Sequence, residues 1–174
     1  MNSFSYRFGP DALTSITTPS NVAYNFGKGD FAIEAWVKTF HGGPVLARMV
    51  DNHRGFVLTL DLNRVVFTTY EESNWNSLEG SSSICDGLWH HVAAVRSGGS
   101  GFLYVDGKAL TTQSSGNVSS PLNVDYTNLL TIGHVDLTTQ SNRLFQGLMA
   151  EICLWNKACT EKEILQKMNQ RLPS

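Results

Sequence analysis

Hydrophobic and polar residues alternate with a period of two along most of the chain, which is the pattern of a half-buried β-strand. Residues 31–38 show it clearly, because Phe31 and Ile33 fall on one face of the predicted strand and Glu34 falls on the other. Turn-forming residues interrupt the alternation at short intervals, so we expect antiparallel sheet throughout the chain. Further strands of this kind are predicted over residues 56–61, 65–70, 129–133 and 148–155.

Two more strands are predicted as a hairpin in the middle of the chain. They cover residues 86–95 (DGLWHHVAAV) and residues 102–108 (FLYVDGK), and the glycine-rich segment 98–101 joins them. Asp106-Gly107 marks a tight turn after the second strand, because glycine accepts the positive φ that such a turn requires.

The two adjacent histidines of this hairpin, His90 and His91, project to opposite faces of a strand and therefore cannot both bind one metal ion. His90 shares the parity of the apolar Val92, so we expect it to face the core. The spacing of the chain's five histidines does not indicate a zinc site.

A single helix is predicted near the C-terminus. Thr160 and Glu163 have the spacing of a capping box, in which the Thr160 hydroxyl accepts from the Glu163 amide and Glu163 accepts from the Thr160 amide. Apolar residues then follow at helical spacing, and Pro173 lies just beyond the predicted end. We expect this helix to lie over the edge of the sheet.

The length and composition fit one domain with a full core, which we place at residues 1–174. Hydrophobic residues make up 41% of the chain and charged residues 16%, a balance usual for all-β proteins with hydroxyl-rich strands. The formal net charge is -2 and the chain has no basic block, so we expect no nucleic-acid partner. The apolar runs are far too short to span a bilayer.

The N-terminal residues 1–8 lack the charged and apolar regions of a secretory signal. The cysteines are odd in number, and buried thiols in a reducing compartment are the simplest interpretation. These features predict a cytoplasmic protein, or one exported without a conventional signal. If the sequence is a fragment that lacks its leader, the protein is secreted. The three cysteines are Cys85, Cys153 and Cys159.

Several segments resemble, in the same order, the strands of one known family. They are FAIEAWVK at 31–38, WHHVA at 89–93, LYVDG at 103–107, GLMAEICLWN at 147–156 and TEKEI at 160–164. The chain thus resembles the laminin-G-like, concanavalin A-like jelly-roll family, to which the pentraxins are related. The resemblance implies an all-β fold, a two-sheet antiparallel β-sandwich with one short C-terminal helix, and structural roles for both hairpin histidines. It implies a binding module more often than an enzyme, although one fold carries many kinds of site.

The carboxylates do not form a recognisable catalytic pattern. Glycoside hydrolases of this shape carry a run that resembles E-x-D-x-x-E, and the chain has no such run. Glu71 and Glu72 are adjacent and would point to opposite faces of a strand. Glu34 and Glu151 stand alone in their predicted strands, although strands distant in sequence could still bring them together. Glu34 is most simply the partner of a lysine or arginine on the face of the sheet. We predict that the protein is not an enzyme.

The resemblance to pentraxins implies a candidate calcium site. In pentraxins an Asp-Asn pair just before a sheet strand supplies two ligands, and Asp51-Asn52 stands at a similar place. Further pentraxin ligands lie in the loop before the closing strand, where Asp136 and Gln140 carry oxygens in this chain. Calcium prefers about six to eight oxygen ligands with several carboxylates, and this set has few carboxylates. The alternative is that Asp51 and Asn52 simply form a turn.

One tryptophan stands apart from the predicted core. Trp75 lies in the polar segment 71–77, and the segment 48–54 is expected on the same rim of the sandwich. Carbohydrate sites usually combine an aromatic ring under the sugar with amides and charged groups around its hydroxyls. Alternatively, Trp75 anchors its loop against the sandwich. The predicted carbohydrate-binding residues are Trp75, Asn74, Asn76, Arg48, Asn52 and His53.

The sequence therefore favours a non-catalytic, lectin-like domain that binds a glycan or glycoconjugate through its rim loops. The first alternative is a protein-interaction or structural laminin-G-like module of a larger extracellular protein, and a glycoside hydrolase ranks third. Calcium is the one predicted cofactor. A homo-oligomer is a further prediction, because two sites in one particle increase avidity.

Overall fold

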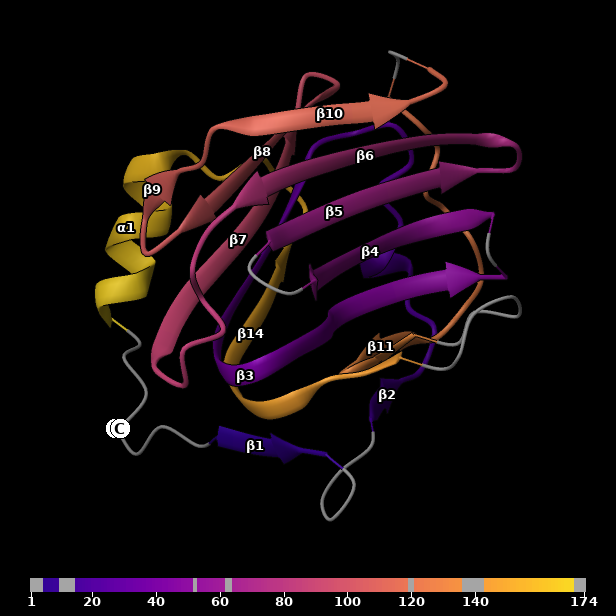
Figure 1. Ribbon diagram of the computed structural model, residues 1–174. Coiled ribbons are helices and arrows are strands. Elements are labelled where there is room, and N and C mark those ends of the chain that lie inside the picture. Colours follow the sequence, from indigo (N-terminus) through magenta and orange to yellow (C-terminus); the bar gives the residue numbers. More distant parts are fainter. Residues whose placement is uncertain are drawn as a thin grey trace.

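The computed structural model describes residues 5–9, 15–51, 53–61, 64–118, 121–135 and 143–170. Strands dominate these residues and one helix follows them, which confirms the predicted all-β class (Figure 1). The elements are β1 (Ser5–Phe8), β2 (Ile16–Thr18), the 3-10 helix η1 (Val22–Tyr24), β3 (Phe31–Val50), β4 (Arg54–Asp61), β5 (Arg64–Glu71), β6 (Asn74–Ser81), β7 (Trp89–Ser97), β8 (Ser100–Val105), β9 (Lys108–Ala109), β10 (Thr112–Gly116), β11 (Leu130–Ile132), β12 (His134–Val135), β13 (Arg143–Leu144), β14 (Gln146–Trp155) and α1 (Glu161–Gln170).

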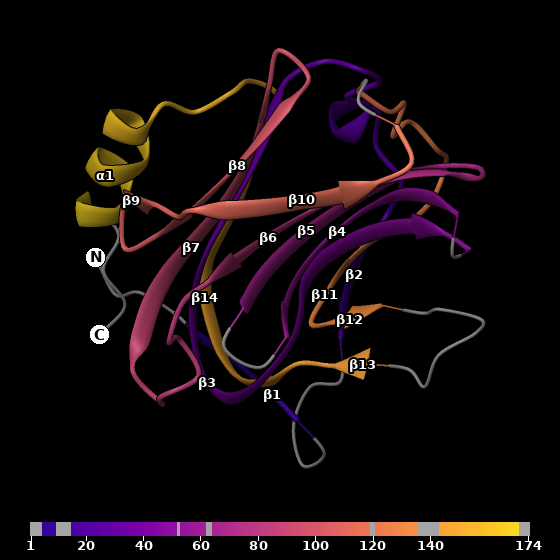
Figure 2. The same cartoon turned by 45° about the horizontal axis from the view of Figure 1, so that its top comes forward.

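Most described strands belong to one hydrogen-bonded sheet, in the order β10-β6-β5-β4-β3-β7-β8-β9. Its middle strand, β3, is 20 residues long and takes part in both layers of the fold. Residues 31–38 of β3 pair with β7 and β14, whereas residues 42–50 pair with β4. The sheet therefore curls over at β3 into two facing antiparallel layers, the expected jelly-roll sandwich (Figure 1, Figure 2).

The bend in β3 lies at Gly42 and Gly43. Gly43 has a φ of +119°, and a Cβ there would lie 2.6 Å from the Cα of Phe145, the residue before β14. A residue with a side chain could not let the two backbones approach so closely. The glycines therefore keep β3 continuous while it changes direction.

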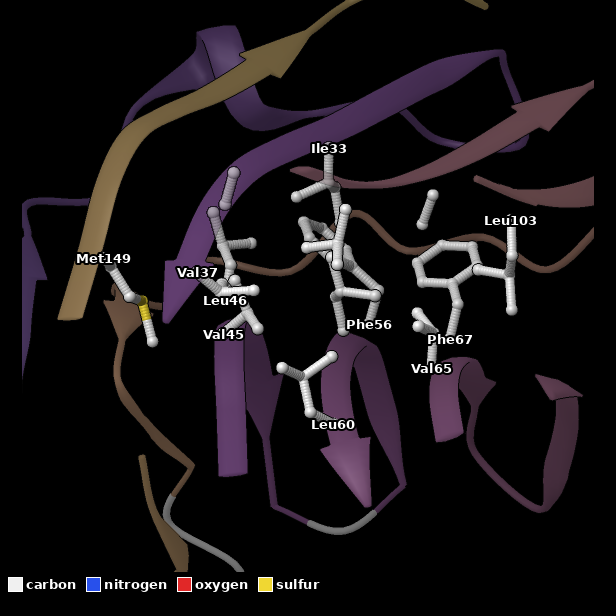
Figure 3. Close-up of a cluster of buried hydrophobic side chains, with 14 of the residues drawn as sticks. Ile33, Val37, Val45, Leu46, Phe56, Leu60, Val65, Phe67, Leu103 and Met149 are labelled. Carbon is white, nitrogen blue, oxygen red and sulfur yellow. The ribbon is translucent and has the colours of Figure 1, made fainter. Parts of the chain in front are cut away.

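The hydrophobic core lies between the two layers. Figure 3 shows Ile33 and Leu103 of one layer facing Phe56 and Phe67 of the other, and all four are at most 4% exposed. Each such side chain contributes about 1.5–3 kcal/mol when it is fully buried. The inner face predicted from the period-two pattern of residues 31–38 is confirmed.

The predicted central hairpin forms as β7 and β8. Gly98 (φ +54°) and Gly99 (φ +85°) make its two-residue turn, so the turn is shorter than the predicted segment 98–101. Asp106-Gly107 connects β8 to β9 as predicted, with φ values of +50° and +74°. Positive φ at both central positions is the type I′ geometry that Asp-Gly favours.

His90 lies near the start of β7, beside this turn; it is half-buried and not in the core as its parity predicted. Its Nδ1 lies 2.8 Å from Oδ2 of Asp106, and its Nε2 lies 3.2 Å from Oδ1 of Asp86. Burial alone would lower the pKa of His90, but the hydrogen bonds and charges of Asp106 and Asp86 outweigh burial, so the pKa lies above its ordinary value.

Replacing His90 by glutamine should remove a pH-dependent part of the stability. Because the folded-state pKa is raised, charged His90 stabilises the fold fully below its unfolded pKa of about 6.5 and loses this effect as the pH rises through the folded pKa. In urea unfolding, we expect the free energy of unfolding of wild type to exceed that of His90→Gln by up to about 1 kcal/mol near pH 5.5. The difference should be smaller near pH 8.5. The control is His41→Gln, which replaces an exposed histidine. An equal difference in stability between wild type and His90→Gln at both pH values would contradict the pairing of His90 with Asp86 and Asp106.

Helix α1 begins with the predicted capping box. The Thr160 amide donates to Glu163 Oε2 at 2.8 Å, and the Glu163 amide donates to Thr160 Oγ1 at 3.3 Å. The helix lies beside β9, the edge strand of the sheet, as predicted, and its buried Ile164 also packs on the outer face of the layer that contains β7 and β8. Among the residues that the structure describes, no helix has the length and apolar character needed to cross a bilayer. The residues around Ile164 are Ala32, Ala93, Val95, Tyr104 and Cys159.

Candidate binding groove and rim

A groove of about 510 Å³ opens between the two layers near β6 and β10. One wall comes from β5, β6 and β10, and the other comes from the turn between β7 and β8 (Figure 2). Sites for small ligands usually measure about 300–1,000 Å³, so the groove is large enough to hold one. Its polar lining includes Thr69, Asn76, Ser100, Thr112 and Ser114.

Small residues on the facing strands explain why the layers leave this space. Pairing of β10 with β6 places Ser114 opposite Leu78, on the inner side of the sheet. Residues 99–101 of the opposite hairpin are two glycines and one serine, and a Cβ on Gly101 would lie 3.1 Å from a methyl carbon of Leu78. Larger side chains at these positions would fill the groove, as they fill the core elsewhere.

Arg96 is the one ionisable residue among the described lining residues, and its charge is directed into the protein. It is 4% exposed and donates to the carbonyl oxygens of Gly27, Gly29 and Leu122 at 2.7–2.8 Å. Burial lowers the pKa of Arg96 to about 10, although nearby carboxylates oppose the change, so the guanidinium is charged at neutral pH. The described groove lining thus offers hydroxyl, amide and apolar groups to a ligand, and no carboxylate.

The two segments predicted to share a rim lie at the same end of the sheet. The register places Arg54 opposite Glu71 and Glu71 opposite Asn74, so the β3–β4 turn and the β5–β6 turn are neighbours. Trp75 lies on β6 opposite Tyr70, and not in a loop as predicted, and it is 38% exposed. Strand pairing therefore brings together two turns that the sequence could only suggest as neighbours.

Trp75 and Asn76 point to opposite faces of β6, because side chains alternate along a strand. Asn76 lines the groove, whereas Trp75 does not. Asn117 fixes the backbone between them: its Oδ1 accepts from the Trp75 amide at 2.8 Å, and its amide donates to the Trp75 carbonyl at 3.2 Å. The predicted carbohydrate-binding set is therefore divided between the groove and the outer rim.

Arg48 does not reach the rim surface where the sequence placed it. It is 1% exposed, and its guanidinium donates to the carbonyl oxygen of Tyr24 and, at 2.8 Å, to Oδ1 of Asn25. Burial lowers the pKa of Arg48. Arginine is rarely buried unless it is paired, which is why a surface position was expected. Of the other predicted residues, His53 is exposed in the β3–β4 turn, and Asn52 lies outside the described residues.

The predicted calcium ligands gain no support from the part of the chain that the structure describes. Asp51 has a φ of +58°, and its carboxylate accepts from the His53 amide and from the Arg54 guanidinium, each at 2.8 Å. Each oxygen thus has a partner within the turn, as the alternative turn interpretation requires. The described ranges contain no group of three His, Cys, Asp or Glu side chains that could hold a metal. The other ligands, Asn52, Asp136 and Gln140, lie outside the described residues, so the calcium site stays a prediction.

The groove residues of β10 and of the β7–β8 turn were not among the predicted site residues. Serine and threonine in an all-β chain carry no specific signal, because they also serve as ordinary strand and turn residues. The available signal was that β10, Thr112–Gly116, is a strand with no apolar face. A strand without an apolar inner face cannot pack against the opposite layer, and a groove results.

The sequence and the structure were compared with known proteins. A family model described as the concanavalin A-like lectin/glucanases superfamily matches residues 11–165. No curated protein matches the sequence significantly. Solved structures match closely in fold, and the chain spans less than half the length of each of those reported next.

One similar structure is the binding domain of botulinum neurotoxin DC in complex with rat synaptotagmin II, with a TM-score of 0.71, 17% identity, and coverage of 98% of this chain and 43% of that chain. The same binding domain in complex with SialylT has a TM-score of 0.69, 19% identity and coverages of 98% and 43%. The binding domain of Paraclostridial Mosquitocidal Protein 1 has a TM-score of 0.69, 15% identity and coverages of 97% and 43%. At these identities the likeness establishes a shared fold. Together with the family match over residues 11–165, it shows that the chain belongs to the concanavalin A-like lectin/glucanase superfamily.

Proposed function

We propose that this chain is a non-catalytic glycan-binding domain whose ligand lies in the groove between β6, β10 and the β7–β8 turn. The observation that carries the proposal is the lining of that groove, in which uncharged hydroxyl and amide groups surround the apolar side chains of Phe67 and Leu78. A sugar presents hydroxyls around its edge and an apolar C–H face, so both parts of the lining would find a partner.

The lack of carboxylates in the described groove lining supports binding without hydrolysis. A glycoside hydrolase needs two carboxyl groups flanking the bond that it cleaves, about 5–10 Å apart. Glu34 and Glu151 do border a common cavity, on the outer face of the fold, but that cavity measures about 10 Å³ and cannot hold a sugar. Neither the groove nor this cavity therefore offers both the carboxyl pair and the space that a hydrolase needs.

The similar structures add support to a glycan ligand. One is a neurotoxin binding domain in complex with SialylT, and another is described by the dependence of botulinum neurotoxin type C cell entry on interaction with two ganglioside molecules. Because those chains are more than twice as long as this one, their ligands do not assign a site here. They show that glycan binding occurs in proteins that contain a domain of this shape.

Filling the groove should abolish glycan binding. Ser114→Trp places a large ring on the inner side of β10, whereas Gln113→Trp places the same ring on the outer side of the same strand. On a glycan array we expect Ser114→Trp to lose at least about tenfold in affinity, or about 1.4 kcal/mol, and Gln113→Trp to bind like wild type. Equal binding by both variants would show that the glycan does not bind in the groove.

The rim is the second place where a glycan could bind, and Trp75→Ala tests it on the same array. Trp75 is the exposed aromatic residue of the predicted set, and its neighbours Asn74 and His53 lie at the same end of the sheet. Loss of binding in Trp75→Ala, with Ser114→Trp unaffected, would move the site to the outer rim and restore the sequence prediction.

A protein-interaction module is the alternative that one observation favours. Phe40 is 70% exposed and Leu88 is 62% exposed, and the Phe40 ring lies against Gly87, where a Cβ would be 2.1 Å from it. Two neighbouring exposed apolar side chains suit a protein partner better than a sugar. An array on which wild type binds no glycan would favour this alternative, and Phe40→Ser with Leu88→Ser would then be the variants to test.

A further inference from the structure

A buried polar cluster lies under α1 on the outer face of β3, β7 and β14, away from the proposed glycan groove. Glu34 and His91 are each 3% exposed, and Oε2 of Glu34 lies 3.5 Å from Nε2 of His91. With Trp36 and Trp155 they border a cavity of about 10 Å³, which is room for about one water molecule. Burying a carboxylate in this way is unfavourable unless a charge partner is supplied.

Lys167 of α1 supplies that charge. Its Nζ lies 3.3 Å from Oε1 of Glu34, 3.1 Å from Sγ of Cys159 and 3.5 Å from the ring centroid of Trp155. Burial alone would raise the pKa of Glu34, but the hydrogen bond with His91 and the charge of Lys167 outweigh burial and lower it. A charged carboxylate beside an aromatic face is a favourable environment for an ammonium ion.

Three ring nitrogens around the cavity have no hydrogen-bond partner among the described residues. They belong to Trp36 (Nε1), His91 (Nδ1) and Trp155 (Nε1). Trp36 and His91 are more than nine-tenths buried, and a buried polar atom without a partner costs about 1–3 kcal/mol. The two indole N–H groups only donate, so they suit a water molecule in the cavity, whereas Nδ1 of His91 is the one nitrogen of the three that could accept a hydrogen bond from an ammonium group.

Helix α1 is attached to the sheet by few buried side chains. Ile164 is its one buried residue, and the neighbouring Leu165 is 44% exposed. Elements with few buried apolar contacts open locally at a free energy well below that of global unfolding. Helix α1, which covers the polar cluster, is therefore expected to open before the sheet does.

We propose that the space under α1 is a binding site for a primary ammonium group, and that Lys167 fills this site from within the chain. The ligand that fits is the lysine side chain of a partner protein, which carries the same ammonium group and aliphatic stem as Lys167. Such a lysine competes with Lys167, so the site is closed while α1 is docked and open when α1 lifts. The site is independent of the glycan groove.

The test removes the Lys167 side chain and adds a small ammonium compound that can take its place. In Lys167→Ala, n-butylammonium replaces the missing stem and charge, and we expect a saturable rise in Tm of about 2–4 °C. Nα-acetyl-lysine amide, which stands for a partner's lysine, should act in the same way. Wild type should respond only at much higher ligand concentrations, because Lys167 competes for the site. If Lys167→Ala does not fold alone, its refolding yield with and without n-butylammonium gives the same comparison.

Three controls separate an ammonium site from a simple hole. 1-Butanol has the same length without the charge and should not raise the Tm of Lys167→Ala. Lys167→Met keeps the stem without the ammonium group, and Lys162→Ala removes an exposed lysine of the same helix; neither variant should respond to n-butylammonium at the concentrations that saturate Lys167→Ala. A rise with 1-butanol equal to that with n-butylammonium, or no response in Lys167→Ala, would overturn the proposal.

Discussion

Arg96→Met is expected to lower the free energy of unfolding by about 3 kcal/mol or more, because three carbonyl oxygens lose their donor and each unpaired buried acceptor costs about 1–3 kcal/mol. The guanidinium joins Gly27 and Gly29, before β3, to Leu122, after β10. It also lies 4.7 Å from the ring centroid of Phe31, whose ring stacks on that of Phe26. Methionine keeps most of the apolar stem, so the loss measures the polar contacts.

The measurement is urea unfolding, which compares the free energies of unfolding of Arg96→Met and of the control Arg64→Met. Arg64 forms ion pairs with Asp61 and Glu79 at the surface, where 40% of its side chain is exposed. Exposed pairs contribute about 0–1 kcal/mol, so Arg64→Met should remain close to wild type. If the two variants lost equal stability, the three carbonyl contacts of Arg96 would not be structural. Arg96→Lys should recover little of the stability, because one ammonium group cannot reproduce the guanidinium's planar fork.

Gly55→Ala is expected to prevent normal pairing of β3 with β4 and to destabilise the fold by more than about 3 kcal/mol. Gly55 has a φ of +119°, and a Cβ there would lie 1.9 Å from the carbonyl oxygen of Arg48. Because that atom is backbone, the contact can be relieved only by moving the strand. Arg48 is itself held by Tyr24 and Asn25, so a shift of β3 at this point would break those bonds as well.

Gly98→Ala is the matched control for Gly55→Ala. Gly98 also has a positive φ, +54°, but a Cβ there would have no atom within 4 Å. Alanine at such a position costs about 1–2 kcal/mol for the left-handed conformation alone. Thermal unfolding of the two variants therefore separates the conformational penalty from the steric clash, and equal Tm values would show that the clash is relieved cheaply.

Much of the fold could be predicted from local patterns, because each pattern reports a local requirement. Alternation in residues 31–38 correctly identified the face that packs in the core between the layers, although the other face is buried as well, and the turn at Asp106-Gly107 followed from backbone geometry. The capping box at Thr160 and Glu163 was equally local. The continuity of β3 through Gly42 and Gly43 was not predictable in this way, because it depends on contact with Phe145, about a hundred residues later.

The candidate sites were harder to predict, because they depend on which face a side chain takes and on which strands become neighbours. Trp75 and Asn76 are adjacent in sequence yet face opposite sides of β6. Arg48 points inward and donates to the carbonyl oxygen of Tyr24, a contact that no sequence pattern predicts. The polar cluster under α1 joins Glu34 to Lys167, and only tertiary packing brings these residues together. The sequence predicted a basic partner for Glu34 on the face of the sheet, whereas the structure supplies Lys167 from α1. Cellular location and homo-oligomer formation stay predictions.

The position of β14 has a consequence for how the protein is made. β14 lies between β1 and the first part of β3, so it fills a gap in the sheet that the earlier strands leave open. Ribosomes release a chain from its N-terminus at about 5–20 residues per second, so β3 is exposed for several seconds before residues 146–155 emerge. An unpaired strand edge of this kind invites pairing with other chains. We expect nascent chains that stop before Trp155 to depend on chaperones, and the domain to close only when its synthesis is nearly complete.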